Sequence, residues 1–574
     1  MASKDDITYF AEADFRNKRT RFGIKRIDRA RHMYIIGKTG MGKSTLLENM
    51  AIQDIQNGEG VAIMDPHGSM AEKLLDYVPE NRVKDVIYFA PFDSDFPLSF
   101  NVMEDVGYDK RHLVASGLMS AFKKIWQDAW SGRMEYILTN TILALLEYPD
   151  ATLLGVNRML SDKEYRKRVV ENVSDPAIKS FWTGEFAKYN ERYMQEAGDA
   201  IKNKVGQFTA NPVIRNVIGQ PHSSFDIRKI MDEKKILIMN LSKGRIGEQN
   251  SNLLGSMLVT KIYLAAMSRA DVMSSQMMSL PDFYLYVDEF QSFANESFAD
   301  ILSEARKYKL NLTIAHQYVE QMPEEVRAAV FGNVGTMAIF RIGSYDAEIF
   351  EKEFAPEFTS EDIVNLGFAQ IYIKLMIDGI GSKPFSAQTL PPIPEPPQSF
   401  KDKIIDNTRQ NYARPRTVVE EDIRKWHEPV SPPASGGGGG PIEPVRSKIS
   451  HGGGTDRSHQ KEERGEERRQ HERRGEEPKH SFTPPQVQPK HDTQAKTPAR
   501  APEHIPLAHL ARRKDKGPSV ENKMVLKEAL EKALSEREEP VSFTGPSAAK
   551  PHQPLSGNEG PKEVSEAELK KVFE

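Results

Sequence analysis

Short, continuous runs of apolar residues recur along the first 390 residues, separated by longer amphipathic stretches. Continuous apolar runs of strand length are typical of parallel strands that are buried on both faces. Such runs occupy residues 33–37, 61–64, 86–90, 235–240, 283–287, 310–315, 336–340 and 370–375. Between residues 110 and 225 the apolar positions follow helical spacing, with almost no strand pattern. The pattern predicts an α/β protein with a mostly parallel sheet, flanking helices and an inserted all-α domain.

The same changes of pattern define the predicted domains. We expect a short joining segment at 1–30, an α/β core made of 31–105 and 226–390, an all-α domain at 106–225, and a proline-containing exit and linker at 391–429. From residue 430 to residue 574, proline and glycine clusters and mixed-charge runs predict a disordered tail, because little apolar surface offsets the chain entropy. Two stretches of the tail, 521–536 and 563–574, have helical spacing. They fit either transient helices or segments that fold on a partner.

The amino-acid composition excludes several classes of site. The 574-residue chain contains no cysteine, which excludes disulfides, thiolate nucleophiles and cysteine-ligated metal sites. Its net charge of −4 gives no overall basic character, so contacts with nucleic acid are expected to use local basic patches. No stretch reaches the roughly 20 apolar residues of a membrane-spanning helix, and no signal-peptide pattern opens the sequence. We therefore expect a cytoplasmic protein.

The stretch IGKTGMGKSTLL, at residues 36–47, predicts a phosphate-binding loop between a strand and a helix. The residues that match G-x-x-x-x-G-K-[ST] are Gly37, Lys38, Thr39, Gly40, Met41, Gly42, Lys43 and Ser44, and Thr45 follows them. Glycines let backbone N–H groups turn toward phosphate oxygens, and the helix N-terminus adds partial positive charge. We expect Lys43 to contact the β- and γ-phosphates of ATP and Ser44 to ligate Mg²⁺.

A pair of carboxylates ends the apolar run in DFYLYVDEF, at residues 282–290. Asp288 is predicted to hold Mg²⁺, and Glu289 to orient the attacking water or take its proton. The alternative is an acidic strand end without a metal. The adjacent pair favours a hydrolase over a kinase or a nucleotide-binding switch.

Other polar residues at predicted strand ends have two interpretations each. Gln317 is either a sensor of the γ-phosphate or an ordinary hydrogen-bonding strand end. Arg306, and as a second choice Arg341, is either an arginine finger for a neighbouring subunit or a surface charge. Asp65 and His67, in DPHG, are expected to shape the rim of the site. His67 has no partner at metal-ligand spacing, so we do not assign it a metal.

Five segments together carry a family resemblance. They are IIGKTGMGKSTLLENM, DPHG, LYVDEFQSFA, SEARKYKLNLTIAHQ and VFGNVGTMAIFR. In this order they resemble the HerA/FtsK superfamily of ring ATPases, and most of all the type IV secretion coupling proteins of the TraD/TraG kind. The resemblance covers roughly residues 30–390. It implies a RecA-like core, an inserted all-α domain, a hexameric ring with a central channel, and ATP-driven transport of DNA or of a DNA–protein substrate.

The resemblance also implies roles for single residues and partners. Lys43 and Ser44 match the phosphate-loop pair, Asp288 and Glu289 the metal and water-activating pair, Arg306 the arginine that acts in trans, and Gln317 the γ-phosphate sensor. DNA and secretion-channel or relaxase-type proteins are the implied partners. Relatives that dock to a membrane channel usually begin with transmembrane helices, whereas roughly 30 soluble residues precede this phosphate loop. Peripheral attachment to the inner membrane through a partner is therefore the alternative to a free cytoplasmic protein.

Three functions remain open from the sequence. The first is a DNA-translocating ATPase, for which Lys243 and Arg245, in LSKGRIGEQNS, are candidate channel residues or a solvated loop. The second is a recruitment protein whose ATPase gates assembly without translocation. The third is a DNA-processing motor that works with a nuclease.

Overall fold

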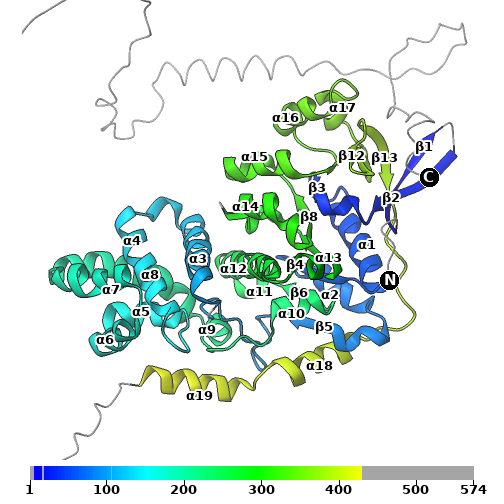
Figure 1. Cartoon of the computed structure of the whole chain (residues 1–574). Coiled ribbons are helices and arrows are strands. Elements are labelled where there is room, and N and C mark those ends of the chain that lie inside the picture. Colours follow the sequence, from blue (N-terminus) through cyan, green and yellow to red (C-terminus); the bar gives the residue numbers. More distant parts are fainter. Residues whose placement is uncertain (1–5, 16–17, 105, 296, 429–574) are drawn as a thin grey trace, which may run out of the picture. The chain divides into compact units, whose positions relative to one another are not determined.

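A computed structural model describes residues 6–15, 18–104, 106–295 and 297–428. The strands are β1 (Ile7–Phe15), β2 (Lys18–Lys25), β3 (Met33–Ile36), β4 (Gly60–Asp65), β5 (Val86–Phe89), β6 (Ile236–Asn240), β7 (Phe283–Val287), β8 (Leu310–His316), β9 (Thr336–Ile339), β10 (Gln370–Lys374), β11 (Met376–Ile377), β12 (Ile380–Gly381) and β13 (Phe385–Thr389). Among these residues, eleven strands form one sheet in the order β2-β1-β13-β10-β9-β3-β8-β7-β4-β6-β5, and β11 pairs with β12 (Figure 1). The strands from β9 to β5 are parallel, whereas β10, β13, β1 and β2 are antiparallel to their neighbours.

The predicted fold class is confirmed. Each of the eight apolar runs is a strand of this sheet, and each predicted boundary lies within one residue of the observed one. The two strands β1 and β2 lie where we predicted only a joining segment. In β2 just Phe22 and Ile24 of the sequence KRTRFGIK are buried, so the strand has a weak apolar signal. Its basic residues lie on an edge strand, where charge discourages pairing with another chain.

Alternating residues of the parallel strands enter two cores on opposite faces of the sheet. Ile35 and Ile63 share one core with Leu46 of α1 (Lys43–Gln56) and with α2 (Ser69–Asp76). Tyr34 belongs to the other core, where its ring stacks on Phe350 with the centroids 6.2 Å apart. That face is covered by α12 (Glu248–Met267), α14 (Ser297–Glu304), α15 (Glu324–Asn333) and α16 (Ser344–Phe354). Burial on both faces explains why the strand sequences are continuously apolar.

Between β5 and β6 the described residues form helices and no strand. These helices are α3 (Arg111–Ile125), α4 (Gly132–Leu146), α5 (Leu154–Ser161), α6 (Lys163–Asn172), α7 (Pro176–Ser180), α8 (Glu191–Ala210), α9 (Pro212–Ile218) and α10 (Ile227–Asp232). We call residues 111–218 the helical segment. Its first helix lies against α12 of the core at Gly117, where an added Cβ would be 2.4 Å from Thr260 Cγ2. The start of the helical segment is therefore packed tightly on the core.

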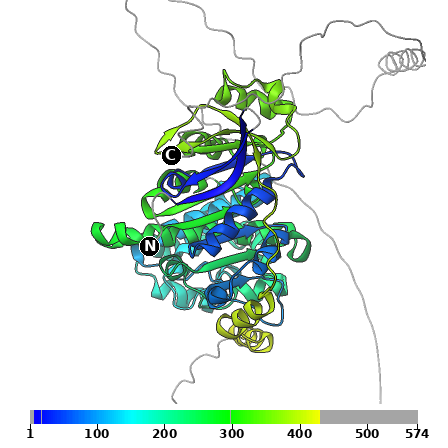
Figure 2. The same ribbon diagram turned by 90° about the vertical axis from the view of Figure 1, so that its right-hand side faces the viewer.

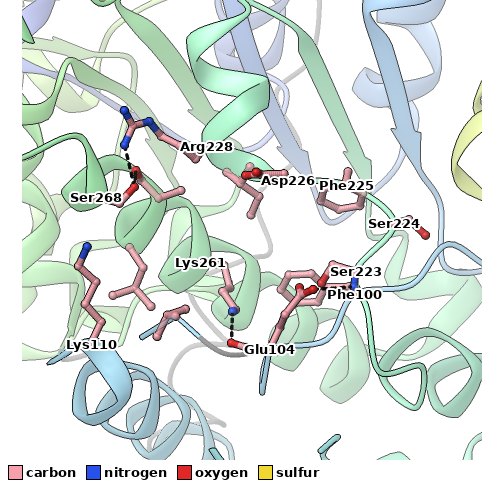
Figure 3. Close-up of a pocket in the computed structure, with 14 residues that line it drawn as sticks. Phe100, Glu104, Lys110, Ser223, Ser224, Phe225, Asp226, Arg228, Lys261 and Ser268 are labelled. Carbon is pink, nitrogen blue, oxygen red and sulfur yellow. Dashed lines mark hydrogen bonds between the residues drawn. The ribbon is translucent and has the colours of Figure 1, made fainter. Parts of the chain in front are cut away.

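A cavity of about 440 Å³ lies where the chain leaves the core for the helical segment and returns from it (Figure 3). Phe100 and Glu104 line it from the outgoing chain, and Phe225 and Arg228 from the returning chain. Its cations are engaged within the protein: Lys261 Nζ donates to the Glu104 carbonyl at 3.2 Å, and Arg228 donates to Ser268 at 3.0 Å. Lys110, which also lines the cavity, donates to Asp271 at 2.6 Å, so each cation that lines it among the described residues has a partner within the protein.

The remaining described helices complete the fold. They are α11 (Lys243–Ile246), α13 (Ser274–Ser279), α17 (Ser360–Val364), α18 (Lys401–Tyr412) and α19 (Arg416–His427). Helices α18 and α19 occupy the span predicted as a proline-containing exit, and they lie beside β5 and α9 respectively (Figure 1 and Figure 2). Thr408 of α18 accepts a hydrogen bond from the Tyr88 N–H of β5, so α18 covers this edge strand.

The predicted tail and the predicted absence of membrane-spanning helices compare with the described residues as follows. The predicted disordered tail, 430–574, with its helical stretches at 521–536 and 563–574, lies outside the described residues. Within the part of the chain that the structure describes, none of the helices is both long enough and apolar enough to span a bilayer.

Candidate functional site

Polar residues from distant parts of the chain meet at the carboxyl ends of the parallel strands. The phosphate loop follows β3, Asp65 ends β4, Asp288 follows β7 and Gln317 follows β8. The parallel ladder aligns Ile36 with His316, so the first residue of the phosphate loop lies beside Gln317. This edge of a parallel sheet is where α/β proteins bind their ligands.

The backbone of the phosphate loop needs its glycines. Gly40 and Gly42 have φ values of 78° and 111°, in the left-handed region that other residues rarely adopt. At Gly37, a Cβ atom would lie 2.5 Å from the Cβ of Phe340, so only glycine fits between the loop and β9. The Gly37 N–H donates to the His316 carbonyl at 3.2 Å, which fixes the loop to β8. The loop then turns directly into the N-terminus of α1.

Lys43 lies across the mouth of the loop. Its side chain is buried, and Nζ donates to the carbonyls of Gly37 at 2.6 Å and Lys38 at 3.2 Å. Burial lowers the pKa of Lys43, while the charges of Glu289 and Asp288 act in the opposite direction. The ammonium group therefore contacts the loop carbonyls and is close enough to both carboxylates to feel their charge, and its contact with phosphates stays a prediction.

Asp288 lies beside the hydroxyl group of Ser44, the residue after Lys43. Ser44 Oγ donates to Asp288 Oδ2 at 3.3 Å, and Asp288 is only 4% exposed. Burial, together with the neighbouring charges of Glu289 and Asp65, raises the pKa of Asp288 to about 6. Asp65 itself accepts the backbone N–H groups of His67 and Ala71, which fixes the start of α2.

Glu289 has an unusual backbone conformation, and both oxygens of its carboxylate accept hydrogen bonds. Its φ of 47° is left-handed, which is uncommon for a residue with a side chain and is often found at functional sites. Gln317 donates to Glu289 Oε1, Gln291 donates to Glu289 Oε2, and His67 Nε2 lies 3.8 Å from Oε1. Thr39 of the phosphate loop donates to Gln317 Oε1 at 2.9 Å. A continuous chain of hydrogen bonds thus joins the phosphate loop to Glu289.

Two side chains and one glycine that we did not select from the sequence position the loop after Glu289. Lys124 of α3 donates to the Gln291 carbonyl at 2.5 Å, and Ser256 of α12 donates to the Phe293 carbonyl at 3.2 Å. Gly255 of α12 lets the Phe293 ring approach, since an added Cβ would lie 2.2 Å from the ring. Nothing in the sequence around Lys124 distinguishes it from other helical lysines. Only the fold shows that the helical segment contacts the loop that carries Glu289.

The candidate channel residues have partners within the chain. Lys243 donates to Ser292 at 2.9 Å and forms an ion pair with Glu248, and Arg245 pairs with Glu72 at 3.1 Å. Lys243 therefore also contacts the loop after Glu289. Their contact with DNA stays a prediction.

The structure does not bring Arg306 to the phosphate loop of its own chain. Arg306 is exposed and precedes β8, at the amino end of the strand whose carboxyl end leads to Gln317. Seven strand residues separate these ends by roughly 20 Å. Arg341 is exposed and lies closer, because its carbonyl accepts the Lys38 N–H at 2.8 Å. An arginine finger at Arg306 could act only on a neighbouring copy.

The oxygen donors at the site fit Mg²⁺. This ion is usually held by one or two carboxylates together with substrate phosphates and water, and not by a cage of protein ligands. Asp288 and Ser44 supply a carboxylate and a hydroxyl side by side. Within the described ranges, no group of three or more His, Asp or Glu side chains has an arrangement that could hold a metal ion by itself.

The fold and the site define a P-loop protein of the RecA-like α/β class, with the loop on a strand of a mostly parallel sheet. A family model described as the type IV secretion-system coupling protein DNA-binding domain matches residues 23–363. The match covers more than half of the 574 residues, and the chain belongs to this family. No curated protein matches the sequence.

Several solved structures are similar to this chain. The plasmid coupling protein TrwB in complex with ADP and Mg²⁺ is 15% identical, with a TM-score of 0.49, and the match covers 65% of this chain and 88% of that chain. The unbound monoclinic form of TrwBΔN70 is 15% identical, with a TM-score of 0.48, covering 65% and 87% respectively. VirB4 of Thermoanaerobacter pseudethanolicus is 13% identical, with a TM-score of 0.46, covering 70% and 99%.

Proposed function

We propose that the protein is an ATP-hydrolysing ring motor that moves DNA, or a DNA–protein substrate, toward a type IV secretion channel. The observation that carries this proposal is the convergence of the loop around Lys43 with the acidic pair after β7. Ser44 and Asp288 are 244 residues apart in sequence and lie within hydrogen-bond distance. Membership of the coupling-protein DNA-binding family supports DNA as the substrate.

Each residue of the site has a proposed part in hydrolysis. Backbone N–H groups of the loop and the ammonium of Lys43 bind the β- and γ-phosphates. Ser44 and Asp288 would hold Mg²⁺, which would neutralise part of the phosphate charge. Glu289 accepts a proton from the attacking water, and Gln317 lies between Glu289 and the loop residue Thr39. A movement of the loop on phosphate binding is therefore passed to Glu289 through Gln317.

The contact from Lys124 to the Gln291 carbonyl supports a link between substrate and hydrolysis. Lys124 lies near the end of α3, the first helix of the helical segment, and Gln291 also donates to Glu289. A shift of α3 when the helical segment engages its substrate would therefore move a direct neighbour of Glu289. This arrangement favours a motor whose turnover responds to the substrate over a site that works independently of it.

The test of this function is the ATP hydrolysis rate of the full chain with and without DNA, across a series of salt concentrations. We expect DNA to stimulate turnover, and the stimulation to fall steeply with salt because DNA is held through its phosphates. Lys43→Ala is the matched inactive control, and it should remove both basal and stimulated turnover. Turnover that no DNA changes would favour the recruitment protein, and turnover retained in Lys43→Ala would place hydrolysis elsewhere.

Arg306 gives a prediction about assembly. If Arg306 completes the site of a neighbouring copy, Arg306→Ala and Glu289→Gln proteins are each inactive alone but recover activity when mixed. Random assembly at equal amounts leaves about a quarter of the boundaries with both residues intact. The measurement is the hydrolysis rate of the mixtures against the two separate proteins. If no mixture recovers activity, Arg306 is not the arginine finger, and Arg341 becomes the favoured candidate for that role.

A further inference from the structure

An exposed aromatic residue lies beside the phosphate loop. Phe368 is 71% exposed, in the loop between α17 and β10. Because β10 is antiparallel to β9, the start of β10 is at the same edge of the sheet as the carboxyl end of β9 and the phosphate loop. At this exposure most of the Phe368 ring is open to contact with a ligand.

The backbone around Phe368 is held in place by hydrogen bonds. Gln370 accepts the Gly367 N–H through Oε1 at 2.7 Å, and the Gln370 N–H donates to the Gly367 carbonyl at 3.3 Å. The Ala369 carbonyl accepts the N–H of Thr389 at 2.8 Å. Ala369 has a φ of 60°, a conformation that an alanine adopts only when its surroundings impose it. The loop thus presents Phe368 from a fixed backbone.

The same backbone is bonded directly to the phosphate loop. The Ala369 N–H donates to the Met41 carbonyl at 3.2 Å, and a Cβ added at Gly42 would lie 3.9 Å from the Ala369 Cα. Met41 and Gly42 immediately precede α1, whose N-terminus is the end that attracts phosphate groups. A nucleotide that places its phosphates in this loop must hold its sugar and base outside the loop, where neighbouring side chains can contact them. Phe368 lies on the side of the loop away from Asp288 and Glu289, because β9 and β10 lie on the opposite side of β3 from β7.

We propose that Phe368 is the stacking platform for the base of the bound nucleoside triphosphate. This inference rests on the proposed function, because it assigns the base end of the ligand whose phosphates Lys43 binds. A flat apolar face matches a purine or pyrimidine ring, and stacking tolerates any base because every base has a π-face. The platform therefore adds affinity for nucleotides over inorganic phosphates, without requiring a choice among bases.

The test compares two ligands on the full-length protein, ATP and inorganic triphosphate, each with Mg²⁺. For Phe368→Ala we expect the Kd of ATP to rise on the order of tenfold, with the Kd of triphosphate unchanged. Phe368→Trp should restore the affinity for ATP. Tyr108→Ala is the control, since Tyr108 is also a highly exposed aromatic residue, at 65%, but lies just before the helical segment.

Every other outcome contradicts the role of Phe368, the proposed function, or both. Unchanged ATP affinity in Phe368→Ala removes the platform and leaves the proposed function intact. An equal loss for both ligands shows that the loop supports the phosphate site instead of the base. Altered self-association with unchanged ATP affinity assigns Phe368 to a contact with a second copy, and also overturns the inference. Wild-type protein that binds neither ligand overturns the proposed function and this inference together.

Discussion

Replacing Glu289 with glutamine is expected to lower the rate of ATP hydrolysis by about 10²–10⁴-fold while ATP still binds. Glutamine keeps the shape of the side chain but cannot accept a proton from water. The hydrogen bonds of Lys43 to the phosphate loop and of Ser44 to Asp288 do not involve the Glu289 carboxylate. The measurement pairs single-turnover hydrolysis with the Kd of ATP, so that loss of chemistry is separated from loss of binding.

The control for this variant is Glu320→Gln. Glu320 follows the carboxyl end of β8, three residues after Gln317, and lines a separate cavity of about 530 Å³ with Lys124. Its replacement changes the local charge by the same amount and should leave turnover close to that of the wild type. Wild-type turnover in Glu289→Gln would remove Glu289 from the proposed mechanism. A matching loss of ATP affinity would show instead that the carboxylate supports the loop.

Replacing Asp288 with asparagine is expected to stabilise the metal-free protein at neutral pH. The pKa of Asp288 is about 6 in the folded protein and 3.8 in the reference state, so the folded protein binds the extra proton between these values. Stability contributed by this group is therefore lost as the pH rises from about 4 to about 6, and the full cost of about 3 kcal/mol applies above that range. Asparagine removes the buried charge and keeps an oxygen that can accept the Glu289 N–H.

The measurement is the thermal unfolding midpoint in EDTA, without nucleotide, at pH 4 and pH 7.5. We expect Asp288→Asn to unfold several degrees above the wild type at pH 7.5, and the difference to close near pH 4. Asp65→Asn is the matched control. Asp65 is also a buried carboxylate, but it accepts two backbone N–H groups at the start of α2, so its replacement should destabilise the protein. A difference between Asp288→Asn and wild type that does not vary with pH would contradict the explanation by charge burial.

The same variant tests the metal site. Adding Mg²⁺ and ATP should raise the unfolding midpoint of the wild type, since ligand binding to the folded state stabilises it. In Asp288→Asn this increase should be much smaller, because Mg²⁺ loses its protein carboxylate. Asp288→Asn should thus unfold at a higher temperature than the wild type without ligand, but gain less from Mg²⁺ and ATP. This combination is expected of a residue that serves ligand binding at the expense of stability.

The sequence predicted the residues that carry local constraints. Gly37, Lys43 and Ser44 form a short motif whose spacing is set by the geometry of phosphate binding. The pair at 288–289 directly follows a continuous apolar run that is typical of a buried strand. The eight predicted strands share this property, because burial on both faces leaves a signal in every residue. The strand β2 was missed because one of its faces is polar.

Only the tertiary structure decided which of these residues lie together at the site and which other residues contact them there. Lys124 contacts the loop after Glu289 only because α3 packs on α12, and Phe368 lies by the phosphate loop only because β10 pairs with β9. Arg306, which lies 11 residues before Gln317 in the sequence, is at the opposite end of β8. By itself the sequence determined eight continuously apolar strands, the phosphate loop motif and the acidic pair, because each depends on neighbouring residues. The order of the strands and the partners of each side chain depend on contacts between residues hundreds of positions apart, and these exist only in the folded chain.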